Sequence, residues 1–218
     1  RYPLTADETA AVLAEPARQA LLQVLAAARE QHFLGPGDVA AHVEHSLAFT
    51  ALVTHPPSAA VDLGSGAGIP GLVLALVWPA SSWVLLDANV RRTGFLRDAV
   101  ESLGLAARVE VLAARAEVAG RDPARRAAAD LVVARAFGPP AVVAECAAPL
   151  LRPGGAMVVA EPPGGAPERW SVEGLGLLGL AESGRMSEPV ALVRLEQVGA
   201  CPDRYPRRIG IPLKRPLF

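Results

Sequence analysis

A glycine-rich turn is the part of this sequence best suited to bind a ligand. The short run 60–63, AVDL, leads into residues 64–71, GSGAGIPG, where glycine stands at every second position from 64 to 68. Glycine lets the backbone turn sharply and lets a ligand approach without a Cβ in the way. A helix that starts after the turn adds unpaired N–H groups at the same place. The pattern therefore predicts a ligand site where a strand ends.

Two carboxylates narrow the class of that ligand. Asp62 stands two residues before the first glycine, where it suits a cationic amino acid group such as that of S-adenosylmethionine and would repel a pyrophosphate. Asp87 ends the next apolar run and could accept hydrogen bonds from both hydroxyls of a ribose. Residues 66–71 also fit the G-x-G-x-x-G pattern of dinucleotide sites, and such a turn can serve packing alone. The position of Asp62 favours S-adenosylmethionine.

Apolar runs alternate with amphipathic segments from residue 60 onward. Strands are predicted at 60–63, 83–86, 108–112, 130–133, 156–160 and 190–195. Helices are predicted at 71–77, 90–103 and 140–151. This alternation indicates right-handed βαβ units, and so an α/β protein with a parallel sheet covered on both faces. Residues 161–187, rich in Gly, Pro and Glu, read as a loop with a poorly defined helix or strand.

The residues before this alternation read as helical. Residues 7–31 are rich in Ala and Leu, and Pro16 is expected to break or restart that helix. A second helix is predicted over 39–53, with Asp38 as its cap. We expect residues 1–57 to form a small N-terminal helical cap and residues 58–218 a ligand-binding domain, packed together as one globular unit.

Composition excludes several classes of protein. The 218 residues carry a formal net charge of −1, which argues against a surface coated with basic residues. Cys146 and Cys201 are the only cysteines, too few for a disulfide scaffold. The apolar run 72–78 is far shorter than the roughly 20 residues of a spanning helix. We therefore expect a cytoplasmic protein that is not bound to a membrane. The basic residues concentrate after Arg204, where there is no acid.

The chain resembles the GidB/RsmG family of 16S rRNA guanine-N7 methyltransferases over roughly residues 36–218. The resemblance is carried by the turn 61–71, Asp87-Ala88, Arg91-Arg92, Phe95-Leu96, Arg115-Ala116-Glu117, Ala134-Arg135-Ala136 and the tail Tyr205-Pro206-Arg207-Arg208-Ile209-Gly210-Ile211-Pro212 with Lys214 and Pro216-Leu217. It implies a class I S-adenosylmethionine-dependent methyltransferase, with a Rossmann-like, mostly parallel seven-stranded sheet and the N-terminal helical cap.

The resemblance also implies a cofactor, a partner and a set of site residues. The cofactor is S-adenosylmethionine and the partner is 16S rRNA or the small ribosomal subunit. The residues expected at the cofactor are Asp62, Gly64, Gly66, Gly68, Ile69, Asp87, Ala88, Ala116, Glu117 and Arg135. Guanine N7 carries a free lone pair, so positioning is needed and a strong general base is not. No catalytic residue is therefore assigned, and we expect a monomer without a metal.

The substrate side is expected to involve Arg135 and the basic tail. Arg135 follows a strand, although an ion pair with Asp130 or another acid would also explain it. Arginine forks suit phosphates, so the candidates for RNA contact are Arg207, Arg208, Lys214 and Arg215. The alternative is a tail packed over the sheet, with its arginines paired to acids such as Glu161, Glu168 and Glu173. Glu117 has its own alternative, a helix-start acid offset by Arg115.

Three departures from the family pattern fall on this substrate side. The family's Trp-Asn and Asn-Leu-Thr stretch is absent from the N-terminal helices. Its His-x-x-Asp-Ser element stands here as residues 42–46, HVEHS, so His45 replaces the acid, and its Lys-Gly is replaced by Glu161-Pro162. His42 and His45 lack an evident third metal ligand. The departures keep two alternatives open: a methyltransferase for another RNA or a small molecule, or a non-catalytic S-adenosylmethionine-binding relative.

Overall fold

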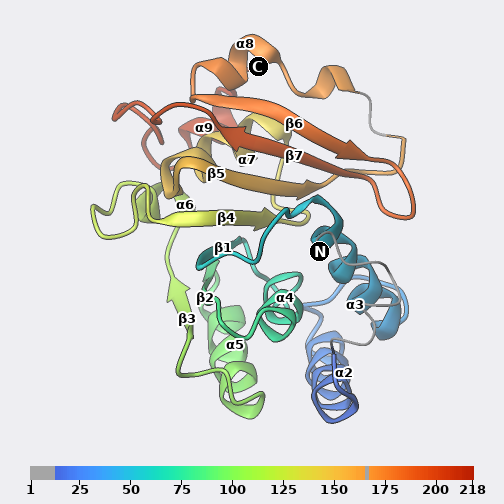
Figure 1. Cartoon of the computed structure of the whole chain (residues 1–218). Coiled ribbons are helices and arrows are strands. Elements are labelled where there is room, and N and C mark those ends of the chain that lie inside the picture. Colours follow the sequence, from blue (N-terminus) through green and yellow to red (C-terminus); the bar gives the residue numbers. More distant parts are fainter. Residues whose placement is uncertain (1–12, 165–166) are drawn as a thin grey trace.

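The structure is a computed structural model that describes residues 13–164 and 167–218. One seven-stranded sheet forms its centre (Figure 1). The strands are β1 (Ala59–Leu63), β2 (Ser82–Asp87), β3 (Val109–Ala113), β4 (Ala129–Ala134), β5 (Leu151–Ala160), β6 (Leu180–Met186) and β7 (Leu192–Gln197). The α-helices are α2 (Glu15–Glu30), α3 (Val39–Leu47), α4 (Gly71–Val77), α5 (Val90–Ser102), α6 (Ala116–Ala119), α7 (Pro140–Ala147), α8 (Val172–Gly176) and α9 (Ile211–Lys214). Short 3-10 helices are η1 (Ala48–Leu52), η2 (Ala148–Leu150) and η3 (Pro167–Arg169).

The strand order is β3-β2-β1-β4-β5-β7-β6, and only β7 runs against its neighbours. Pairing is parallel from β3 through β5, with Val61 opposite Val84 of β2 on one side and Val132 of β4 on the other. The chain order reverses between β1 and β4. In open α/β sheets, ligands bind outside the carboxyl ends of the strands at such a reversal.

Two hydrophobic clusters cover the two faces of the sheet, because its central strands are apolar on both sides. One cluster joins α2 to α5 with one face, through side chains such as Leu21, Leu72 and Leu96. The other joins α6 to α8 and the C-terminal tail with the opposite face. Figure 1 shows α2 and α3 beside α4, and α8 beyond the outer strand β6.

The N-terminal helices therefore share a core with the sheet. α2 begins at Glu15 with Pro16 in its first turn, which is where proline is tolerated, so a helix boundary lies at the predicted proline. The earlier part of the predicted helix, residues 7–12, lies outside the described residues. The division of the chain at residues 57 and 58 stays a prediction.

The structure corrects several predicted boundaries. The helix predicted over 39–53 ends at Leu47 and continues as η1, and the one predicted over 140–151 ends at Ala147. The strand predicted at 156–160 starts at Leu151, and residues 180–186 form a strand that the sequence did not predict as such. Within the described residues, no helix is long and apolar enough to cross a membrane.

Candidate functional site

The glycine turn after β1 needs its glycines. Gly64, Gly66 and Gly68 have φ values of +73°, +59° and +92°, which L side chains rarely adopt. A Cβ on Gly64 would lie 2.5 Å from Cδ2 of Phe137, and one on Gly66 would meet only the carbonyl oxygen of Gly64, at 3.8 Å. The backbone at Gly66 is therefore open to a ligand. This supports the predicted binding turn over one that serves packing alone.

Asp62 lies behind this turn, with only 1% of its surface exposed. Its Oδ2 accepts hydrogen bonds from Ser65 Oγ (2.6 Å) and from the Gly71 N–H (3.0 Å), so the carboxylate holds both ends of the turn together. Its Oδ1 has no hydrogen-bond partner. Burial raises the pKa of Asp62 to about 6. Its predicted contact with a ligand ammonium group stays a prediction, and its observed contacts shape the turn.

Asp87 ends β2 beside the turn and faces a cavity of about 290 Å³, which we call the Asp87 cavity. Its Oδ2 accepts from the Gly66 N–H (3.0 Å) and its Oδ1 from the Asn89 N–H (2.8 Å). A carboxylate offers about four acceptor sites, so two remain for a diol. Asn89 also caps α5, which fixes the chain after Asp87. The other predicted residues that line this cavity are Gly64, Ala88, Ala116 and Glu117.

Two more cavities adjoin the first, and Ala136 lines all three. The glycine-turn cavity, about 220 Å³, is lined by residues that include Gly66, Ile69, His42 and Arg135. The third, about 300 Å³, is lined by His45, Arg135, Phe137, Glu161, Arg169 and Trp170, among others, and we call it the Glu161 cavity. Three adjoining cavities, which share Ala136 in their walls, thus lie at the carboxyl ends of the central strands, and we call them together the branched groove.

Glu117 lines the Asp87 cavity. It is 4% exposed, forms an ion pair with Arg115 (3.1 Å) and accepts a hydrogen bond from the Gly210 N–H (2.9 Å). Burial acts to raise the pKa of Glu117, but Arg115 and the Gly210 N–H hold that pKa below its ordinary value. Both interpretations of Glu117 are therefore compatible: the residue pairs with Arg115 and also lines the cavity.

Arg135 stands where the glycine-turn cavity and the Glu161 cavity meet. Its Nη2 lies 2.8 Å from Nδ1 of His42, whose Nε2 lies 3.3 Å from the Gly35 carbonyl oxygen. Its Nη1 is buried and has no partner. The alternative of an ion pair with Asp130 is wrong, because Asp130 pairs with Arg152 and accepts from the backbone at 58 and 59. Arg135 keeps a free donor at the junction.

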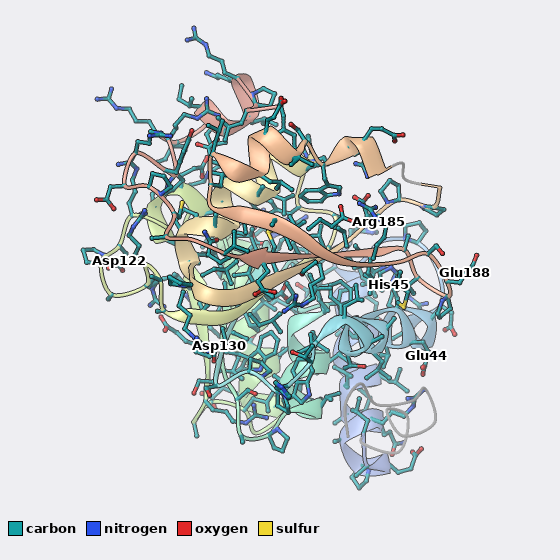
Figure 2. The ribbon with its side chains drawn as sticks, turned by 45° about the horizontal axis from the view of Figure 1, so that its top comes forward. Glu44, His45, Asp122, Asp130, Arg185 and Glu188 are labelled. Atoms are coloured by element: carbon teal, nitrogen blue, oxygen red, sulfur yellow. The ribbon has the colours of Figure 1, made fainter. Side chains whose placement is uncertain are left out.

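The two substituted positions of the family pattern, His45 and Glu161, line the same cavity. Burial, with Arg135 and His42 nearby, lowers the pKa of His45 to about 4, so this imidazole is neutral at pH 7. Glu161 forms ion pairs with Arg169 (2.8 Å) and Arg185 (3.5 Å). Figure 2 shows His45 and Arg185 at the same end of the sheet, away from Asp122. Within the described ranges, no group of three His, Cys, Asp or Glu side chains could hold a metal ion.

The basic tail is only partly free. Arg207 is bound to the fully buried Glu145 through its N–H (2.8 Å), Nε (2.8 Å) and Nη2 (2.6 Å), so its guanidinium already has an internal partner, and its role as an RNA contact stays a prediction. The predicted alternative partners Glu161, Glu168 and Glu173 are not the acids involved. Arg208, Lys214 and Arg215 are exposed and form no ion pair with any described residue.

The structure adds site residues that the sequence did not single out for this role. Arg92 lines both the Asp87 and glycine-turn cavities and lies 3.8 Å from Asp87 Oδ2. Phe137 covers Gly64, Trp170 lines the Glu161 cavity and Leu213 of the tail lines the Asp87 cavity. Arg92 lies in the first turn of α5, which follows β2, and Phe137 lies three residues after the end of β4, so the positions of both near strand ends could have signalled them. Trp170 and Leu213 reach the site only through the tertiary fold.

Cys146 is buried, as predicted, and burial raises the pKa of its thiol to about 12.

Four features of the groove fit S-adenosylmethionine. The backbone at Gly66 is open to a ligand, and the two remaining acceptor sites of Asp87 suit the two hydroxyls of a ribose. The unpartnered Arg135 Nη1 suits a carboxylate, and the unpartnered Asp62 Oδ1 leaves negative charge behind the turn. The turn, residues 64–71, contains no Arg or Lys that could balance the negative charge of a pyrophosphate.

The strand order with one reversed strand, together with this turn, defines a class I methyltransferase fold. Solved structures share the fold at low identity: an O-methyltransferase from Bacillus cereus in complex with SAH (15% identity, 82% of this chain and 90% of that chain, TM-score 0.58) and a C9 mutein of the branched-chain polyamine synthase of Thermus thermophilus (19%, 84% and 64%, 0.59). The family model GidB, described as rRNA small subunit methyltransferase G, matches residues 35–161. The chain belongs to the GidB family.

Curated relatives agree with this assignment. Ribosomal RNA small subunit methyltransferase G of Rubrobacter xylanophilus is 40% identical over 169 residues, which are 72% of this chain and 64% of the relative. The protein of the same name from Deinococcus deserti is 39% identical over 170 residues, 72% of this chain and 68% of the relative. The aligned part thus spans slightly less than two thirds of the first of these relatives.

Proposed function

We propose that this chain binds S-adenosylmethionine and methylates N7 of a guanine in the 16S rRNA of the small ribosomal subunit. Family membership supports the class of substrate. The observation that carries the proposal is the branched groove at the carboxyl ends of the strands, whose three adjoining cavities share Ala136 in their lining. The Asp87 cavity and the glycine-turn cavity suit the two ends of the cofactor. The Glu161 cavity adjoins both and would hold the guanine base.

The residues of the first two branches would hold the cofactor. Asp87 would accept hydrogen bonds from the ribose hydroxyls, and Ala116 with Glu117 would lie against the adenine. The turn at Gly64 and Gly66 would follow the methionine part, with the Arg135 Nη1 donor near its carboxylate. When bound, the cofactor supplies an electrophilic methyl group on a sulfonium.

The reaction requires the protein to position the reacting groups, and it requires no proton transfer. The N7 lone pair forms a bond to the methyl carbon as the carbon–sulfur bond breaks; the electron pair stays on sulfur and the positive charge passes to the base. No proton leaves N7, so the neutral His45 need not act as a base. Alignment of the reacting atoms can supply on the order of 7–11 kcal/mol of the barrier. Arg135, held by His42, would orient ligands on both sides of the junction.

The free cations of the tail are proposed to meet phosphates of the RNA. Arg208, Lys214 and Arg215 are exposed beside Leu213, which lines the Asp87 cavity. Ion pairing with phosphates dominates nucleic-acid affinity and is screened by salt. A small patch of this kind is compatible with the net charge of −1. Arg207 is left out because Glu145 binds it.

A second candidate is methyl transfer to another RNA or to a small molecule, which His45 and Glu161 favour because both line the third cavity. One experiment separates the candidates. The protein is incubated with S-adenosylmethionine labelled on the methyl group and with small ribosomal subunits from a strain that lacks the N7 mark. Label in 16S rRNA supports the proposal. Cofactor binding by calorimetry without transfer to rRNA would favour the second candidate, and absence of cofactor binding would contradict both.

A further inference from the structure

The Glu161 cavity gathers polar atoms that lack partners. His45 Nδ1, Arg135 Nη1 and Trp170 Nε1 are all buried without a hydrogen bond, and all three residues line this cavity. Buried polar groups in native proteins are nearly always paired, so each exception calls for an explanation. Trp170 Nε1 and Arg135 Nη1 can only donate hydrogen bonds. Two of the residues that line the cavity, Arg135 and Trp170, thus hold unused donors, which suit a ligand with acceptor atoms.

The same cavity also holds an acceptor, Glu161, whose side chain is 3% exposed. One oxygen pairs with Arg169 Nη1 at 2.8 Å and the other with Arg185 Nη1 at 3.5 Å. Arg185 is shared with Glu182, which it binds at 2.8 Å, so its charge is divided between two carboxylates. Two of the roughly four acceptor sites of Glu161 remain unused. A ligand in this cavity thus meets a fixed carboxylate as well as free donors.

This combination of donors and acceptor matches guanine among the bases. The N1–H and N2–H₂ groups of guanine are adjacent donors that a carboxylate can accept together, whereas N1 of adenine is an acceptor that a carboxylate repels. Guanine O6 is an acceptor on the side toward N7. With N7 toward the junction at Ala136, O6 would lie on the side of Arg135 and the N1–N2 edge would point away from the cofactor branches.

We propose that Glu161 reads the N1–N2 edge of an extruded guanine in this cavity, a role that rests on the proposed function and adds the specificity-determining residue. Enzymes that act on a base take it out of its stack and read its edge in such a pocket. A carboxylate at this edge also favours the positive charge that the base acquires when N7 is methylated. The residue is therefore a partner of the substrate as well as of two arginines.

The test uses the full chain with S-adenosylhomocysteine and three probes: GMP, IMP and AMP. IMP lacks the N2 amine but keeps N1–H and O6. Binding is followed by quenching of tryptophan fluorescence, for which Trp170 is the reporter and Trp170→Phe the check, because Trp78 and Trp83 stack on each other in the core. Wild type should bind GMP roughly tenfold or more tightly than IMP, the effect of losing one hydrogen bond to a charged acceptor, and AMP weakest of the three.

Glu161→Gln should remove most of the difference between GMP and IMP, because the amide offers one acceptor and a donor. Glu182→Gln is the matched control: it also takes a partner from Arg185, but Glu182 is exposed and lies outside the cavity lining, so the preference for GMP should persist. Thermal unfolding of each variant is measured alongside. If Glu161→Gln does not fold, Glu161→Asp replaces it, and shortening the side chain should reduce the same preference.

Equal affinity for GMP and IMP in wild type, absence of saturable quenching by GMP, or an unchanged preference in the Glu161 variant would overturn the inference. These results are distinct from failure of the proposed function. Labelling of 16S rRNA by a protein that shows no preference between GMP and IMP would refute only the role of Glu161. A preference for GMP without transfer to rRNA would refute only the proposed ribosomal substrate.

Discussion

The ion pair between Arg207 of the tail and Glu145 should contribute strongly to the free energy of unfolding. Glu145 lies on α7 with its side chain fully buried, and Arg207 supplies three hydrogen bonds to it, two of them from the guanidinium. Arg207→Ala would leave the carboxylate buried with only the backbone N–H of residue 207. Breaking one side of a buried pair costs about 3 to 5 kcal/mol. We expect the free energy of unfolding to fall by that amount.

The assay is urea unfolding followed by far-ultraviolet circular dichroism, with the free energy obtained by linear extrapolation. Arg208→Ala is the matched control, because Arg208 is exposed and pairs with no described acid; it should change stability by no more than about 0.5 kcal/mol. Adding Glu145→Gln to Arg207→Ala should recover part of the loss, since the remaining buried group is then neutral. Unfolding of Arg207→Ala at the same urea concentration as wild type, with an unchanged slope, would show that the ion pair with Glu145 does not stabilise the fold.

Further predictions concern three titratable groups of the site. Asp87→Ala should weaken S-adenosylmethionine binding by about 1.5 to 3 kcal/mol in calorimetry, because charge-assisted hydrogen bonds are lost; unchanged affinity would remove Asp87 from the site. The pKa of Asp62 is about 6 in the folded protein and 3.8 ordinarily, so the folded state binds more protons in between. Wild type should therefore lose stability relative to Asp62→Asn as the pH rises from 4 to 7, by roughly 2 kcal/mol, and parallel pH profiles of stability would contradict this. The pKa of His45 is lowered from 6.5 to about 4, so the unfolded state binds more protons there, and His45→Gln should lessen the loss of stability as the pH falls from 6.5 to 4.

The parallel part of the sheet was predictable because its strands are continuous apolar runs between turn residues. β6 was not, since LAESGRM carries few apolar residues and pairs only with β7 at the edge of the sheet. Edge strands of this kind depend on their neighbour more than on their own pattern. The early start of β5 at Leu151 likewise depends on pairing with Ala129 across a shift in register.

The site was predictable in its residue types but not in the directions of its side chains. The glycines and Asp87 lie where the pattern places a ligand, because their roles follow from the backbone at the end of a strand. Asp62 and Arg207 have the right chemistry for a cofactor and for RNA, yet both are bound to internal partners. His45 and Glu161 reach one cavity from distant parts of the chain, a proximity that only the fold reveals.

Methyl transfer to guanine N7 of 16S rRNA can be tested by identifying the nucleoside that receives the label. Small subunits that lack the mark are incubated with the protein and labelled S-adenosylmethionine, and the 16S rRNA is digested to nucleosides and separated by chromatography with mass spectrometry. We expect all of the label to appear in 7-methylguanosine. Label in another nucleoside, or none in 16S rRNA from a protein that binds the cofactor, would contradict it.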